Sequence, residues 1–441
     1  AWLAGWHCSP HAPYLFDLQA LLPGHADSNF ALGGGLPEGE AEAGTLPREE
    51  ARRLAATVLQ ETPTLRYFLE RTSEGQLPHG RCGEGECECF PPYRGQLCEL
   101  EDVPRHPQKL RAVIHYITAE TERDMVDLQR SLTSLWQRFN QHYDYPIVIF
   151  HEGLSPAARR RIISASENRV WLVLLPRFKE VPKEWANTAK QVAQDFSVGY
   201  CAMTRWRSGP IFLEPALAGF DYAMTLDTDS YFPADLAVDP FEFVHERGLI
   251  AAFPHLGRES ASVVVNFLHY FLLYCRLLGL HPRRTQMLAS LVESNFKWYQ
   301  QCLMLDIEIL RLDWFRGPHY QDMFRYMDST GGFWLHRWGN NPFRTFAVAL
   351  LLEDKDVKAV ELPYAHQDYC SCGPDRAPCD WNAERGIYEC REVPGSPKGT
   401  IGVSDLAEGL LDLQPWRGTE RQKSKFIPQD ILQFVDEHLP P

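Results

Sequence analysis

The sequence predicts an α/β protein with a largely parallel sheet, and three observations support this fold class. Short apolar runs recur along the chain from Leu110 onward, and stretches with helical spacing lie between them. The composition is that of a globular protein, with 44% hydrophobic and 23% charged residues among 441. Strands that alternate with helices form parallel sheets, because each helix carries the chain back across the sheet before the next strand.

Five apolar runs are predicted to be buried strands because they are short and continuous. They are Ala112–Ile117, Pro146–Phe150, Val170–Leu175, Tyr222–Leu226 and Leu249–Phe253. The spacing of apolar residues predicts helices at Glu122–Gln141 and Trp185–Phe196. The longest apolar stretch, Val263–Leu280, is interrupted by polar residues, so we expect a buried helix there and no membrane span.

The first 105 residues differ in character from the rest. Residues 31–46 are rich in Gly, Pro, Ala and Glu without periodicity, which predicts a flexible connection, and a short helix is expected at Arg48–Glu61. A cysteine-rich stretch follows at 79–99. We therefore predict an N-terminal extension over 1–78, a small cysteine-bearing segment over 79–105 and an α/β domain over 106–441.

Two groups of cysteines indicate the compartment in which the chain folds. Eight of the twelve cysteines fall in these groups, namely Cys82, Cys87, Cys89 and Cys98, and Cys370, Cys372, Cys379 and Cys390. Zinc and disulfides are the two interpretations. The spacing lacks paired C-x-x-C knuckles and nearby histidines at finger spacing, which favours disulfides and an oxidising compartment. A zinc protein stays the alternative, and a titration of free thiols would decide between them.

The charge balance excludes some classes of partner. The chain carries 58 acidic and 44 basic residues, a formal net charge of −14. Sequence-independent binding of nucleic acid needs a basic surface, and so does attraction to an anionic membrane. We expect neither, so an anionic ligand would have to be held by a few local groups.

One predicted strand leads directly into a pair of carboxylates. The run Tyr222–Leu226 is followed by Asp227 and Asp229, whose side chains point the same way on an extended chain and can converge on one cation. A metal ion at such a place could neutralise the diphosphate that leaves during glycosyl transfer from a nucleotide sugar. The alternative is a solvated Asp-x-Asp turn, and the spacing alone leaves both open.

A series of motifs between residues 111 and 380 gives a more specific indication. They are Arg138-Phe-Asn-Gln-His-Tyr-Asp-Tyr-Pro, Tyr200-Cys-Ala-Met-Thr-Arg205-Trp-Arg-Ser208-Gly209, Asp227-Thr-Asp229, Asp306-Ile-Glu308-Ile, Asp313-Trp-Phe-Arg316, Thr330-Gly-Gly-Phe-Trp-Leu-His-Arg337-Trp338-Gly339 and Tyr364-Ala-His366. In order and approximate spacing, the chain resembles the fungal Golgi α-1,2-mannosyltransferases of glycosyltransferase family 15. The resemblance implies a GT-A-type fold, Mn²⁺, GDP-mannose as donor and retention of anomeric configuration.

The resemblance also implies a metal site. Asp227 and Asp229 stand at the family's Glu-Pro-Asp motif, whose first carboxylate binds the metal, and Asp229 is expected to contact the nucleotide sugar as well. His366 matches the histidine that completes the site, although by itself it would read as a structural histidine. A neutral imidazole beside carboxylates suits Mn²⁺ better than Mg²⁺.

The same resemblance suggests residues around the reacting sugar. Glu308 matches a carboxylate that faces the anomeric carbon, where retention proceeds through a covalent intermediate or by front-face attack. Tyr200 matches a tyrosine near the reaction centre and the donor. Arg205 matches an arginine that could contact the diphosphate, and a structural arginine is the alternative.

Some positions depart from the family pattern around the expected donor and acceptor pockets. Thr225 replaces an arginine, Asp227 is shorter than the family's glutamate, and Asn340 replaces an acid. A shifted polar group can change which sugar a pocket accepts. The alternatives are therefore the same fold acting on a UDP-sugar, or an inactive protein that binds glycans or acts as a scaffold.

The cysteine-bearing segment resembles the second half of an EGF-like module, which implies a Cys89–Cys98 disulfide. With the family resemblance, it suggests an enzyme of the Golgi or another secretory lumen, either secreted or a type II membrane protein. Its acceptor would be a glycan or glycoprotein. Contact with the membrane would come only through an N-terminal anchor that is removed or absent from this sequence. The cluster from Cys370 to Cys390 is expected to staple the loop after His366.

Overall fold

The computed structural model describes residues 79–390, apart from 83–86, 96–97, 99, 108–109, 176–180, 184, 187–196, 237, 368, 373–378, 383 and 385–386. The predicted N-terminal extension, the flexible connection and the helix Arg48–Glu61 lie outside the described residues. The predicted helix Trp185–Phe196 lies almost entirely outside them.

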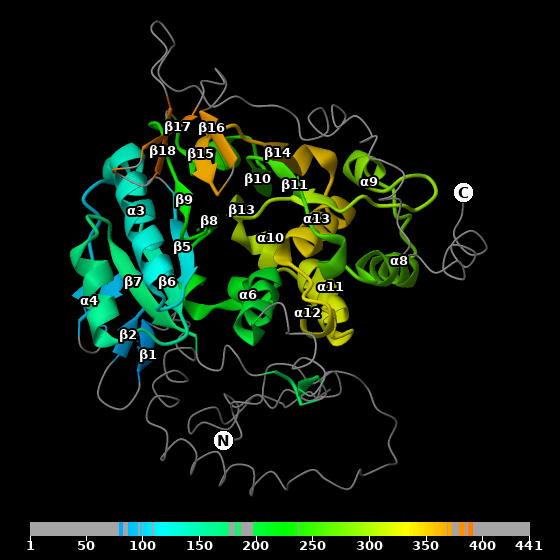
Figure 1. The fold of residues 1–441 in the computed structure, drawn as a ribbon, viewed down its shortest axis with the longest axis horizontal. Helices are drawn as coiled ribbons and strands as arrows, with labels where there is room; N and C mark the ends of the chain where they lie inside the picture. The colour runs from blue at the N-terminus through cyan, green and yellow to red at the C-terminus, as the bar shows by residue number, and fades with distance from the viewer. Residues whose placement is uncertain are drawn as a thin grey trace, which may run out of the picture.

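A seven-stranded mixed sheet forms the centre of the protein (Figure 1). In spatial order its strands are β14 (Val357–Ala359), β10 (Ala251–Phe253), β13 (Ile307–Arg311), β8 (Tyr222–Leu226), β5 (Ala112–Thr118), β6 (Ile147–His151) and β7 (Val170–Leu174). Only β13 runs antiparallel to its neighbours in this sheet; the other pairs are parallel. The predicted α/β class with a mixed, mostly parallel sheet is confirmed.

Side chains that alternate along the strands divide the core into two parts. On β5, Ala112, Ile114 and Tyr116 belong to one hydrophobic cluster and Val113 to the other, as expected for a strand buried on both faces. The first face is covered by α3 (Glu122–Arg138), α4 (Pro156–Ser164) and α7 (Pro240–Glu246). The second face is covered by α6 (Val198–Ser208), α8 (Phe267–Leu278), α11 (Pro318–Ser329) and α13 (Asn340–Leu351).

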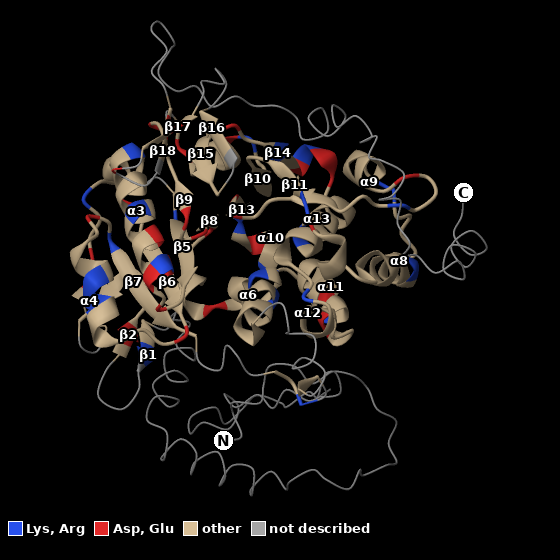
Figure 2. Ribbon diagram, in the orientation of Figure 1, with Lys and Arg blue, Asp and Glu red and all other residues tan. Residues whose placement is uncertain are grey.

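The helix α3 shows how the sequence specifies a covering helix. The side chain of Thr121 accepts a hydrogen bond from the Asp124 amide and caps the first turn. Met125, Leu128 and Leu132 recur at helical spacing and are buried against the sheet. Residues on the opposite face are polar, and the colours of Figure 2 mark both acidic and basic residues along α3.

The apolar stretch that includes α8 is confirmed as a buried helix. Phe267, Phe271 and Cys275 are fully buried in the core that α8 shares with α11 and α13. Gly279 ends the helix in the left-handed conformation, which a glycine adopts without strain. Within the described residues, no helix is both long enough and apolar enough to cross a membrane.

The remaining elements are short and lie around the sheet. The helices are α9 (Gln286–Leu291), α10 (Leu312–Arg316) and α12 (Gly332–Leu335), with single 3₁₀ turns at Asn140–His142, Pro210–Leu213, Pro215–Leu217, Ala261–Val263 and Asp354–Asp356. The strands are β1 (Gly80–Cys82), β2 (Cys87–Cys89), β3 (Tyr93–Arg94), β4 (Leu100–Glu101), β9 (Ser230–Tyr231), β11 (Leu256–Arg258), β12 (Gln301–Leu303), β15 (Pro363–His366), β16 (Tyr369–Cys372), β17 (Cys379–Asn382) and β18 (Ile387–Cys390).

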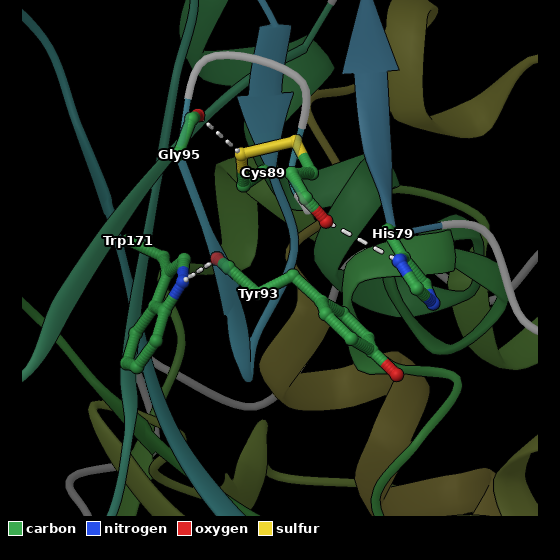
Figure 3. The surroundings of a disulfide bond; sticks show 6 residues. His79, Cys89, Tyr93, Gly95 and Trp171 are labelled. Atoms are coloured by element: carbon green, nitrogen blue, oxygen red, sulfur yellow. Dashed lines mark hydrogen bonds between the residues drawn. A yellow bond between two sulfur atoms is a disulfide. The ribbon is translucent and has the colours of Figure 1, made fainter. Parts of the chain in front are cut away.

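The cysteine-bearing segment packs against the edge strand β7. It contains the disulfide Cys89–Cys98 that the resemblance implied (Figure 3). The Trp171 indole N–H donates a hydrogen bond to the Tyr93 carbonyl at 2.8 Å, and the Arg94 guanidinium lies 4.0 Å from the centre of the Trp171 ring. The segment therefore covers the β7 end of the sheet, where exposed backbone groups would otherwise invite pairing with another chain.

Two further disulfides secure the chain after His366. They join Cys370 to Cys379 and Cys372 to Cys390. The first links β16 to β17 and the second links β16 to β18. The expected stapling of this region is confirmed, and these four cysteines form disulfides, as the preferred interpretation predicted.

Candidate metal and donor site

The site begins where the chain leaves the carboxyl end of β8. The Asp227 amide donates hydrogen bonds to the Asp306 carbonyl at 3.0 Å and to Ser230 Oγ at 3.1 Å. Ser230 Oγ lies 2.7 Å from the Tyr364 hydroxyl, and both residues are buried. These contacts fix the short loop that carries the two aspartates. A solvated turn would not need such contacts.

Asp227, Asp229 and His366 converge at this loop. His366 ends β15, which pairs with β9 so that His366 lies opposite Ser230. Its Nε2 atom is 3.0 Å from Asp229 Oδ1 and 3.7 Å from Asp227 Oδ2. One potential ligand atom from each of the three residues lies within 4.8 Å of the others. Strand pairing thus brings together residues that are far apart in sequence.

The electrostatics of the three residues fit a bound cation. Burial lowers the pKa of His366, but the hydrogen bond to Asp229 and the surrounding carboxylates outweigh it and raise that pKa to about 9. Burial also opposes ionisation of Asp229, yet contact with His366 leaves its pKa below the usual range. The site therefore favours a positive charge, which a divalent cation would supply through one nitrogen and several carboxylate oxygens.

Arg207 lies beside the candidate metal ligands, whereas Arg205 pairs with a different carboxylate. Arg207 is buried, and its NH1 atom is 2.5 Å from Asp227 Oδ1. Arg205 forms a two-armed ion pair with Asp328, with both hydrogen bonds at 2.6 Å. Both arginines are on α6, where side chains two positions apart do not face the same way. The expected contact of Arg205 with a diphosphate stays a prediction.

Arg207 could have been found from its spacing. It lies seven residues after Tyr200, which is two helical turns, so both residues share one face of α6. The sequence predicted no role for Arg207, because the family resemblance implied a role for Arg205 only.

Asp306 is a second residue that received no role. Its two carboxylate oxygens are 3.6 Å from His366 Nδ1 and 3.5 Å from His255 Nε2. It is buried and lies directly before β13. Its position two residues before Glu308 was the available signal. Asp306 can orient the ring of His366, as carboxylates often do for metal-binding histidines.

Glu308 lies deeper, on β13 opposite Thr225 of β8. It is only 2% exposed, and its Oε1 atom accepts a hydrogen bond from Thr225 Oγ1 at 3.0 Å. The Arg344 NH2 atom lies 3.4 Å from the same oxygen. Burial raises the pKa of Glu308, and the positive charge of Arg344 opposes that rise. The strand is fully buried at this point.

Tyr200 stands at the exposed side of the site. It is 38% exposed, its hydroxyl accepts a hydrogen bond from Arg337 at 2.7 Å, and the Arg337 guanidinium stacks over its ring at 4.5 Å. Arg337 NH1 is also 3.6 Å from Glu259. Trp338, next in the chain, is fully buried and packs against Phe267.

The two glycines of the Gly-Gly-Phe motif make this packing possible. A Cβ atom on Gly332 would lie 2.3 Å from the Trp338 ring, so no larger residue fits there without movement. Gly331 has a φ of +75°, in the left-handed region that favours glycine. The motif thus serves to place Trp338 and, beside it, Arg337.

The sequence profile of the glycolipid 2-alpha-mannosyltransferase family matches residues 95–385. The chain belongs to this family. This confirms the resemblance to family 15, and the protein is a glycosyltransferase by membership.

Individual members of the family are similar over much of their length. The chain is 24% identical over 348 residues to O-glycoside alpha-1,2-mannosyltransferase homolog 4 of Schizosaccharomyces pombe, covering 67% of this chain and 78% of the relative. It is 23% identical over 274 residues to the glycolipid 2-alpha-mannosyltransferase of Saccharomyces cerevisiae, covering 59% and 62%.

Solved structures of similar proteins share the fold of this family member. Core-mannan synthase A from Aspergillus fumigatus, in a Mn/GDP form, gives a TM-score of 0.56 at 19% identity and covers 71% of this chain and 94% of its own. The mannosyltransferase Ktr4p of S. cerevisiae, in complex with GDP, gives 0.53 at 18% identity and covers 65% and 82%. The predicted GT-A-type fold class is confirmed.

Proposed function

We propose that this family member transfers mannose from GDP-mannose to a hydroxyl group of a glycan or glycoprotein, with a divalent cation and with retention at the anomeric carbon. The observation that carries the proposal is the convergence of Asp227, Asp229 and His366 after β8. The names of its relatives, which include α-1,2-mannosyltransferases, support the sugar. The structures with GDP, one of them also with Mn, support the donor and the metal.

Asp227, Asp229 and His366 would hold the cation, and Mn²⁺ is the ion that suits a site with both imidazole and carboxylate ligands. When bound, such an ion neutralises the diphosphate as it leaves. Arg207 binds the other oxygen of Asp227 and fixes that carboxylate in one orientation. Tyr200, at the exposed side, would contact the donor, with Arg337 holding its hydroxyl.

Glu308 would stabilise the positive charge that develops at the anomeric carbon. In the transfer, the bond from that carbon to the diphosphate oxygen breaks and its electron pair leaves with GDP. The acceptor oxygen bonds to the carbon, and its proton passes to the departing diphosphate or to water. Retention arises by way of a covalent intermediate, in which a carboxylate bonds to the anomeric carbon, or by attack on the same face, in which a carboxylate can stabilise the ion pair.

The disulfides support an oxidising compartment, and the resemblance to fungal Golgi mannosyltransferases supports the Golgi lumen as the place of action. The acceptor would then be a glycan or glycoprotein that passes through the same compartment. A protein that binds glycans without catalysis is the second candidate, and Thr225, where the family has arginine, is the observation that favours it.

A binding experiment tests the donor and the metal together. Isothermal titration of GDP and UDP, with and without Mn²⁺, should show that GDP binds at least 10-fold more tightly when Mn²⁺ is present. Asp229→Ala should remove most of this gain, because it deletes a proposed ligand. Asp235→Ala is the matched control, since that carboxylate is 70% exposed and pairs only with Arg138 among the described contacts. Equal binding of GDP with and without Mn²⁺ would contradict the proposal. A protein whose melting temperature is raised by glycans but not by GDP would favour the second candidate.

A further inference from the structure

Three polar residues form a row across three adjacent strands. His115 of β5 lies opposite Thr225 of β8, and Thr225 lies opposite Glu308 of β13. The residues two positions away on the same strands share the same face of the sheet. These residues, Val113, Ala223 and Leu310, belong to the core covered by α6 and α13. The row therefore faces that side of the sheet, and each of its members is only 2% exposed.

Hydrogen bonds in the row run in one direction, towards Glu308. With Glu308 ionised, its carboxylate only accepts, so the Thr225 hydroxyl donates to Oε1 at 3.0 Å. Thr225 has one hydrogen to give, so at 3.0 Å His115 Nε2–H is the donor to Thr225 Oγ1. A neutral His115 ring with its hydrogen on Nε2 can make this bond. Burial lowers the pKa of the ring to about 3, so the ring is neutral at pH 7.

Arg344 approaches the same oxygen from α13. It is 1% exposed, and its NH2 atom donates to the Arg207 carbonyl at 2.7 Å while lying 3.4 Å from Glu308 Oε1. The guanidinium also lies 4.4 Å from the centre of the Phe212 ring and 5.1 Å from that of Phe315. Both the backbone contact and the rings fix Arg344 in place.

The second oxygen of Glu308 is in a different situation. Among the described residues, Oε2 is buried and has no hydrogen-bond partner. A buried carboxylate oxygen without a partner costs free energy. Its presence therefore indicates a ligand or a catalytic role. Glu308 lies opposite Thr225, which is two residues before Asp227, so it lies close to a candidate metal ligand, and the charge of Asp227 contributes to the rise of the Glu308 pKa.

We propose that Thr225 and Arg344 are positioning residues that hold Oε1 of Glu308 and leave Oε2 as the oxygen that faces the anomeric carbon of the donor. The proposal rests on the proposed function, because it assumes that Glu308 acts on the donor sugar. In this chain a hydroxyl from β8 and a cation from α13 therefore approach the same oxygen of Glu308.

A comparison of two substitutions at Thr225 separates positioning from packing. Thr225→Val keeps the shape and removes the hydroxyl, whereas Thr225→Ser keeps the hydroxyl and removes a methyl group. We expect Thr225→Val to lower kcat about 10-fold, the effect of losing a hydrogen bond to a charged group, with the donor KM changed less than about 2-fold. Thr225→Ser should keep kcat within about 2-fold of wild type. A packing role predicts the reverse order, and that result would overturn the proposal, as would unchanged kcat in both variants.

Arg344→Met should lower kcat about 100-fold, and Arg344→Lys should recover part of the loss, because an ammonium supplies the charge without the planar fork. The matched controls are Arg169→Met and Thr285→Val, which remove another buried ion pair and another buried hydroxyl. Both controls should lower the melting temperature without lowering kcat. If Arg344→Met fails to fold, the pair of Thr225 variants still decides.

Failure of this inference can be told apart from failure of the proposed function. The series uses whichever nucleotide sugar the wild-type chain turns over. If wild type turns over none, or if Glu308→Gln is as active as wild type, the proposed function fails at that point. If Glu308→Gln is inactive while Thr225→Val and Arg344→Met are fully active, only the positioning role is wrong.

Discussion

Three carboxylates surround His366, and they determine how the metal-free site responds to pH. Despite burial, Asp229, Asp227 and Asp306 raise the pKa of His366 to about 9, above its ordinary value of 6.5. A group whose pKa is raised on folding stabilises the folded state below the unfolded pKa, and the contribution disappears as pH rises through the folded pKa. The relevant window is therefore from about pH 6.5 to about pH 9.

In the metal-free protein, we expect the free energy of unfolding to fall by about 3 kcal/mol across this window because His366 loses its proton. His366→Gln removes the titrating group and should flatten the dependence by that amount. Urea unfolding in EDTA between pH 6 and pH 9.5 measures the difference. Parallel curves for the two proteins would show that His366 is not held as a charged partner of Asp229.

For individual residues, the sequence predicted which side chains belong to the site better than it predicted which residues they contact. Asp227, Asp229 and His366 were predicted to share a site, and strand pairing does bring them together. The contacts of Arg207 and Arg344 could not be predicted, because they depend on how α6 and α13 cross above the sheet. Helical spacing gives the face of one helix, but it does not say which strand that face will cover.

Among the elements, the hairpin of β15 and β16 determines the position of His366. Ala365 pairs with Cys370, so the strand that carries two disulfides lies directly beside the strand that carries the ligand. The Cys372–Cys390 bond closes a loop with a sequence separation of 18. Such a crosslink restricts the unfolded chain and stabilises the fold by about 3 kcal/mol.

Removal of this disulfide in Cys372→Ser/Cys390→Ser should lower the melting temperature and also weaken Mn²⁺ binding, because β16 supports His366. Calorimetry and Mn²⁺ titration measure the two effects. Cys89→Ser/Cys98→Ser is the matched control, since its segment packs against the edge strand β7 and lies well away from β15 and β16 in Figure 1. The control should lose stability but keep its Mn²⁺ affinity. An equal loss of affinity in both variants would argue against a local role for the hairpin.

The element boundaries show what a pattern can and cannot predict. The apolar runs located β5 to β8 and β10 to within two residues, because strands buried on both faces are continuous in apolar character. The antiparallel course of β13 was not predicted. Strand direction depends on the connection before it, and between β10 and β13 the sequence pattern predicted the helix α8 but not α9 or the short strands β11 and β12.

For the whole molecule, the cysteine-bearing segment is attached through contacts that no motif reveals. Glu88, between two cysteines, accepts a hydrogen bond from the Leu174 amide at 2.7 Å and pairs with Arg159 at 2.9 Å. The Leu174 amide and the Tyr93 carbonyl that bonds Trp171 are backbone groups, which every residue type offers. The sequence therefore indicated a separate segment and its internal disulfide, but it could not show where the segment docks.

The most direct test of the central claim is a donor screen. The protein is incubated with Mn²⁺ and a panel of GDP- and UDP-sugars, and release of the nucleoside diphosphate is followed for wild type, Asp227→Ala and Asp235→Ala. We predict turnover of GDP-mannose by wild type and by Asp235→Ala, with a loss of more than about 100-fold in Asp227→Ala because a metal ligand is missing. Turnover of a UDP-sugar alone, or GDP-mannose turnover that survives in Asp227→Ala, would contradict the proposed donor or the proposed metal site.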